Sequence, residues 1–150
     1  MSDLDELYQD LIMDHGRRPR NTGALPEANR HGRGHNPLCG DQLTLALVVE
    51  GDVVREARFE GQGCAISTAS ASLMTQAIKG LAVAEVEALY DRFHLVLTGD
   101  GDGDAPELGK LAALSGVRRF PTRVKCATLA WHTLHAALNP DTAGDAATTE

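Results

Sequence analysis

The chain has few cations, few aromatic side chains and no long apolar run. Its 14 Lys and Arg are outnumbered by 21 Asp and Glu, which gives a formal net charge of -7 at pH 7. Because nucleic-acid phosphates are bound by basic surfaces, this balance argues against a nucleic-acid partner. No stretch approaches the roughly 20 apolar residues that a membrane span requires, and the acidic, amphipathic N-terminus is unlike a secretion signal. The sequence therefore predicts a cytoplasmic protein that binds no membrane.

Cysteine is equally scarce, with three residues in a chain of 150. Three cysteines cannot all pair within one chain, and a reducing compartment would keep their thiols free. They are better interpreted as metal ligands, nucleophiles or buried packing groups, and their number alone does not choose among these. With 43% hydrophobic and only 4% aromatic residues, the chain can bury one core built mostly of Leu, Val and Ala.

Apolar periodicity predicts both strands and helices. Residues 43–49 and 53–60 alternate between apolar and polar side chains around a Glu50–Asp52 turn, which indicates an antiparallel hairpin. Gly61–Gly63 allows a second reversal into a short edge strand over 64–66. Helices are expected over residues 3–15, 67–79, 83–93, 108–114 and 121–138.

These elements predict one α+β domain over residues 1–138, in which a small three-stranded antiparallel sheet carries helices on one face. Residues 16–40 are rich in Gly, Pro, Asn and Arg without either period, so a long loop is expected there. The tail, residues 139–150, has too little apolar content to be ordered by packing and is expected to be disordered.

Four residues, three cysteines and one aspartate, could together form a metal-binding or reactive site. Cys39 and Asp41 are separated by a single glycine, which lets the backbone turn so that both side chains face one point. Cys64 follows a Gly-x-Gly turn, and Cys126 lies early in the last predicted helix. Three thiolates and one carboxylate would form a complete ligand set for Zn²⁺ and an acceptable one for an iron-sulfur cluster. Spacing alone leaves buried structural cysteines as an alternative, because the chain has no CxxC pair.

Four separated motifs place these residues in a context typical of one family. The motifs are Tyr8–His15 with Arg18–Asn21, Asn36–Asp41, Phe59–Ser72 and Phe120–Ala127. In this order they resemble the U-type iron-sulfur cluster assembly proteins of the IscU/NifU N-terminal family, and the resemblance reaches to about Leu138. Lys125 before the last cysteine, and a long interval between Cys64 and Cys126, resemble the SufU branch more than the IscU scaffolds. The resemblance implies a SufU/IscU-like fold.

Resemblance to the SufU branch also implies a function. It implies a zinc-bound acceptor of persulfide sulfur from a SufS-type cysteine desulfurase, with Cys39, Asp41, Cys64 and Cys126 as ligands. Cys39 would accept the sulfur while a histidine of the desulfurase takes its place on the metal, and downstream iron-sulfur scaffold proteins would receive it. One alternative is a scaffold that binds iron or assembles a [2Fe-2S] cluster on the same ligands. Another is a structural zinc module that only docks on a partner.

Two cations precede the last cysteine. Arg123 stands three residues before Cys126, from where it could contact Asp41 or an incoming anionic persulfide and so assist the transfer. Lys125 could offset the formal charge of about -2 that three thiolates and a carboxylate leave on Zn²⁺. The alternative is that both are solvated cations. The six histidines are interpreted as surface or packing groups.

Overall fold

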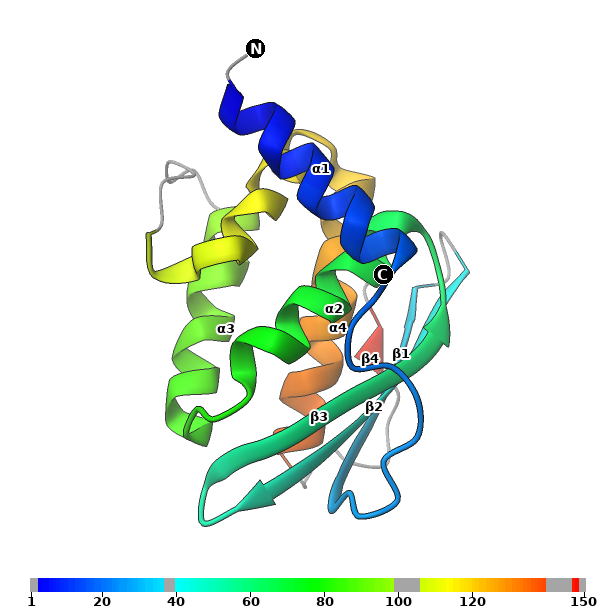
Figure 1. Ribbon diagram of the computed structural model, residues 1–150, viewed down its shortest axis with the longest axis vertical. Helices are drawn as coiled ribbons and strands as arrows, with labels where there is room; N and C mark the ends of the chain where they lie inside the picture. The colour runs from blue at the N-terminus through cyan, green and yellow to red at the C-terminus, as the bar shows by residue number, and fades with distance from the viewer. Residues whose placement is uncertain (1–2, 37–39, 99–105, 140–146, 149–150) are drawn as a thin grey trace.

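A computed structural model describes residues 3–36, 40–98, 106–139 and 147–148. Figure 1 shows a twisted sheet with the helices gathered on one of its faces. Along the chain the elements are α1 (Asp3–Arg17), β1 (Arg30–Asn36), β2 (Asp41–Glu50), β3 (Val53–Gln62), α2 (Ala65–Ile78), α3 (Val83–Thr98), the 3-10 helix η1 (Pro106–Arg119), α4 (Pro121–Leu138) and β4 (Ala147–Thr148). None of the helices described is long and apolar enough to cross a bilayer.

The sheet has the strand order β3-β2-β1-β4. β1 and β3 both pair with β2 in antiparallel fashion, which confirms the predicted α+β domain with three antiparallel strands. β4 adds a two-residue parallel strand beside β1, so Ala147 and Thr148 of the expected tail are paired with the sheet. Disorder in the rest of that tail, and a single domain ending at 138, stay predictions.

The third antiparallel strand is not the predicted one. Ala65 begins α2 instead of continuing an edge strand over 64–66, and the third strand is β1, which lies inside the predicted 16–40 loop. β1 lacks an apolar alternation because glycines take its inward positions. A Cβ on Gly32 would lie 2.6 Å from the carbonyl oxygen of Thr133, so α4 approaches β1 more closely than any larger side chain allows.

The core fills the space between the helices and one face of the sheet. Inward-facing residues of the hairpin, including Leu45, Leu47 and Val54, are fully buried there. α4 packs on β1 and β2, and α2 packs on β3, so these two helices cover the sheet directly (Figure 1). The rings of Phe93 and Trp131 stack with centroids 4.5 Å apart and join α3 to α4.

A buried polar contact fastens the N-terminal helix to α2. The Nδ1 atom of His15 lies 2.7 Å from Ser72 Oγ, and the backbone N–H of Arg20 donates to the same oxygen over 2.8 Å. Ser72 Oγ therefore joins α1, the segment that follows it and α2 at one buried point. Burial, reinforced by the nearby Arg20 guanidinium, lowers the pKa of His15 below its ordinary value of 6.5. The sequence motif around His15 therefore has a packing role.

A second histidine lies half-buried between α3 and α4. The Tyr90 hydroxyl lies 3.0 Å from Nδ1 of His132, and His94 and His135 also pack near the Tyr90 ring. Burial, reinforced by His94 and His135, lowers the pKa of His132 below its ordinary value of 6.5. A charged imidazole is therefore disfavoured here, and His132 acts as a packing group of the helix interface.

Acid is expected to weaken the fold through His132. Because its pKa is lower in the folded chain than in the unfolded chain, its stabilising contribution is complete above about pH 6.5 and is lost as the pH falls toward the lowered value. The free energy of unfolding, measured by urea titration between about pH 7.5 and 5.5, should fall less steeply in His132→Gln than in the wild type. His31→Gln, at an exposed position of β1, should keep the wild-type slope. Equal slopes in all three chains would contradict this prediction.

Candidate metal centre

Three of the four predicted ligands converge where β2, α2 and α4 begin. Asp41 is the first residue of β2, Cys64 is the N-cap of α2, and Cys126 lies in the second turn of α4. One donor atom from each lies within 4.8 Å of the others. Cys39, the fourth predicted ligand, lies outside the described residues. Gly40 has φ +72°, a left-handed conformation that glycine adopts without strain, directly before Asp41.

The Asp41 carboxylate is buried and oriented by the chain itself. It is 1% exposed, and its Oδ1 atom accepts the backbone N–H of Cys64 over 2.9 Å. Its Oδ2 atom lies 3.9 Å from Cys64 Sγ. Among the residues that the structure describes, no salt bridge involves Asp41. Because a buried carboxylate beside two thiols needs a compensating cation, this donor set fits a divalent metal such as Zn²⁺.

Each of the two described thiols has an N–H group beside it. The Cys64 sulfur accepts the backbone N–H of Ser67 over 3.4 Å and thereby caps α2, where the positive end of the helix dipole stabilises negative charge. The Cys126 thiol is 2% exposed, and the Asn36 side-chain nitrogen lies 4.0 Å from its sulfur. Asn36 is fully buried at the end of β1. Sequence reasoning did not assign Asn36 a role, although it begins the motif that contains Asp41.

Gly63 makes room for the carboxylate. A Cβ at this position would lie 2.6 Å from Asp41 Oδ1, closer than van der Waals contact permits. Gly63→Ala is therefore expected to displace the carboxylate and to weaken zinc binding by tenfold or more (about 1.4 kcal/mol), although it removes no ligand. Gly51→Ala, in the β2–β3 turn at φ +56°, strains the backbone but meets nothing within 4 Å, so it should lower stability and leave zinc affinity unchanged. Competition with a chromogenic chelator measures both, and equal affinities would contradict the steric account.

The two cations near Cys126 differ in their surroundings. Arg123 is exposed, and within the described part of the chain its side chain forms no ion pair or hydrogen bond with Asp41. Lys125 is half-buried. A role for Arg123 in assisting sulfur transfer therefore remains a prediction, and it would act on an incoming group and not on the ligand carboxylate.

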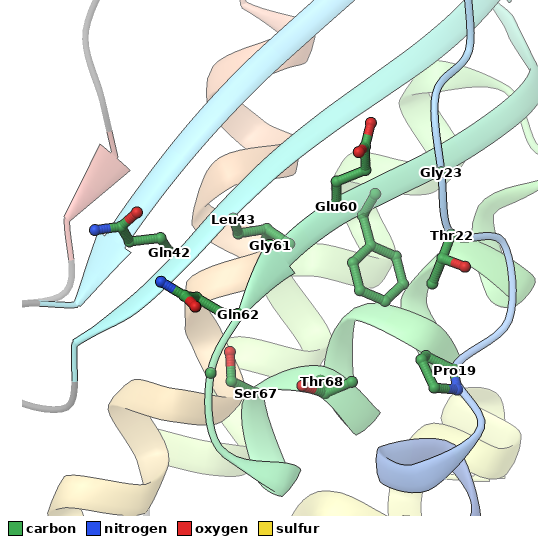
Figure 2. Close-up of a pocket in the computed structure, with 12 residues that line it drawn as sticks. Pro19, Thr22, Gly23, Gln42, Leu43, Glu60, Gly61, Gln62, Ser67 and Thr68 are labelled. Carbon is green, nitrogen blue, oxygen red and sulfur yellow. The ribbon is translucent and has the colours of Figure 1, made fainter.

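A pocket of about 320 Å³ lies at the β3–α2 turn, which leads into Cys64. Of its lining residues, Gly63 precedes Cys64 and lies against the Asp41 carboxylate, whereas Gln42 faces away from the buried Asp41 on β2. Figure 2 shows the Gln42 and Gln62 side chains on neighbouring strands, next to Ser67 at the start of α2. The remaining lining residues are Pro19, Thr22, Gly23, Leu43, Phe59, Glu60, Gly61 and Thr68.

Fold and site together define a small α+β domain with a candidate thiol-carboxylate metal centre at the end of its sheet. Residues 7–127 match the NifU-like N terminal domain. The chain therefore belongs to this family.

Relatives of known description cover almost the whole chain. The zinc-dependent sulfurtransferase SufU of Bacillus subtilis is 42% identical over 144 residues, which are 96% of this chain and 97% of that protein. The iron-sulfur cluster assembly scaffold protein IscU of Streptococcus pyogenes is 39% identical over 92% of this chain and 86% of its own length. A crystal structure from Fervidobacterium islandicum, described as a scaffold protein for the SUF system, superposes with a TM-score of 0.83 at 34% identity. That match covers 89% of this chain and 98% of the other.

Proposed function

We propose that this chain acts in iron-sulfur cluster biogenesis as a zinc-dependent acceptor of persulfide sulfur from a SufS-type cysteine desulfurase. The observation that carries the proposal is the convergence of Asp41, Cys64 and Cys126, with Cys39 two residues before Asp41 in the chain. The 42% identity to a zinc-dependent sulfurtransferase over nearly the full length supports the same activity. Downstream iron-sulfur scaffold proteins would receive the sulfur.

The proposal divides the four ligands into two groups. Asp41, Cys64 and Cys126 would hold the metal, because each has an intramolecular N–H group beside its donor atom. Cys39 would be the ligand that leaves and reacts. A bound zinc ion would neutralise the clustered negative charge and keep the thiols ionised near neutral pH.

The transfer itself is a thiol-persulfide exchange. The Cys39 thiolate attacks the terminal sulfur of the desulfurase's cysteine persulfide, and a new sulfur-sulfur bond forms on Cys39. The old sulfur-sulfur bond breaks, and its electron pair leaves with the desulfurase cysteine, which takes up a proton. The step needs no external oxidant or reductant, because one persulfide replaces another.

A scaffold for a [2Fe-2S] cluster on the same ligands is the second candidate function. It is favoured by the relatives named IscU scaffolds, two of which are 39% and 40% identical to this chain. Metal analysis of freshly purified protein separates the two functions. Stoichiometric zinc in a colourless sample supports the sulfur acceptor, whereas iron and sulfide in a brown sample support the scaffold. Zinc without any sulfur uptake from a desulfurase would leave only a docking role.

The pocket at the β3–α2 turn is the expected path of the partner. Gln62→Trp, at an exposed lining position, should fill the pocket and lower the rate of sulfur acceptance by tenfold or more (about 1.4 kcal/mol) without loss of zinc. Gln76→Trp, on an exposed part of α2 outside the pocket, is the matched control and should keep the wild-type rate. A wild-type rate in Gln62→Trp would contradict this path.

A further inference from the structure

A short hydrogen bond joins the two helices that carry the described thiols. The hydroxyl of Ser70, on α2, donates to the backbone carbonyl oxygen of Ala127, on α4, over 2.6 Å. Ser70 is fully buried, and so is Ala127. Ala127 directly follows Cys126, so the bond reaches the very turn of α4 that presents this thiol to the metal centre.

The other end of the bond is anchored close to Cys64. Ser70 stands six residues after Cys64, which caps the same helix, and this corresponds to roughly 9 Å along a rigid α-helix. The small serine side chain also lets the two backbones approach each other, as a larger residue would not. One hydrogen bond thus connects α2, which has Cys64 as its N-cap, to α4, which carries Cys126.

We infer that Ser70 is a positioning residue of the metal centre, which sets the spacing between the Cys64 and Cys126 sulfurs. The inference rests on the proposed metal-binding function of these residues. Metal-ligand distances tolerate only small errors, so a looser helix pair would hold the ion less well. The spacing would matter most during transfer, because Asp41, Cys64 and Cys126 would then be the only ligands of this chain that hold the ion.

Ser72 offers a matched comparison on the same helix. It is also fully buried, and its hydroxyl is also engaged, but its partners are His15 and the backbone N–H of Arg20. Ser70→Ala and Ser72→Ala therefore remove the same group from equally buried positions. They differ in the element that is released: α4 with Cys126 in the first case, and the N-terminal helix with the segment after it in the second.

The test measures zinc release and ligand geometry in the full-length chain. Wild type, Ser70→Ala and Ser72→Ala are loaded with zinc, and the rate of transfer to a chromogenic chelator is followed. Ser70→Ala should release zinc about fivefold faster than the wild type, the effect of one hydrogen bond, and Ser72→Ala within about twofold of it. With Co²⁺ in place of zinc, the d–d absorption bands should change only in Ser70→Ala. Thermal melting verifies that both variants are folded.

Equal release rates in the two variants, or a wild-type rate and cobalt spectrum in Ser70→Ala, would overturn the inference while leaving the metal centre intact. Failure of the wild type itself to bind zinc would be a different result. It would overturn the proposed metal centre, and the positioning role would fall with it.

Discussion

Replacing Cys39 by serine is expected to abolish sulfur acceptance from a persulfide-loaded desulfurase. A serine hydroxyl is not ionised near neutral pH and forms no persulfide, so the rate should fall by about 100-fold or more. Asp41, Cys64 and Cys126 remain as ligands, and part of the zinc should therefore be retained. Mass spectrometry of the intact chain, which detects the added sulfur atom, measures the transfer, and metal analysis measures the zinc.

Cys126→Ser serves as the contrast to Cys39→Ser. Its thiol is 2% exposed and belongs to the holding group, so its replacement should cost the metal first and sulfur acceptance as a consequence. The two variants therefore differ in zinc content although both fail to accept sulfur. Sulfur uptake by Cys39→Ser at the wild-type rate would disprove the assignment of Cys39 as the acceptor.

Removal of zinc is expected to lower the melting temperature by about 10 °C. A ligand present at about 1,000 times its dissociation constant stabilises a folded chain by about 4 kcal/mol, which corresponds to such a shift for a domain of this length. Without a cation, negative charge on a buried carboxylate and two thiols that lie within 4.8 Å of one another is also unfavourable. Scanning calorimetry with and without a strong chelator measures the change.

The chelator should have little effect on a chain that cannot hold the metal. Cys126→Ser provides this control, since its melting temperature should already be low and should not fall further on chelation. Gly51→Ala should start from a lower melting temperature, because alanine is strained at φ +56°, but chelation should lower it by as much as in the wild type. An unchanged melting temperature after complete removal of zinc from the wild type would show that the centre does not support the fold.

Local patterns in the sequence were sufficient to predict much of the fold. The alternation over β2 and β3 predicted the hairpin, because side chains of a half-buried strand face the core at every second position. Pro121 predicted the first turn of α4, and the spacing of apolar residues predicted the principal helices. The motifs around Cys39, Asp41, Cys64 and Cys126 predicted the family, which the comparison with the NifU-like N terminal domain confirms.

β1 could not be predicted from its own sequence, because the residues at its inward positions are determined by the close approach of α4. Gly32 and Gly34 occupy inward positions against α4, so the strand shows no apolar alternation and its sequence predicts a loop. The start of α2 was missed for a related reason. Ser67 is a common capping residue, but the cap is the Cys64 sulfur, which accepts the Ser67 N–H.

The sequence by itself determined the class of the protein, its family and the identity of the candidate ligands, because these depend on residue types at fixed spacings along the chain. Only the tertiary structure brought Asp41, Cys64 and Cys126 within 4.8 Å of one another. It alone decided that Asn36 approaches the Cys126 thiol and that Ser70 links α2 to α4. The physical reason is that such contacts join residues 23 to 90 positions apart, and no periodicity of the chain encodes how closely two helices and a sheet approach.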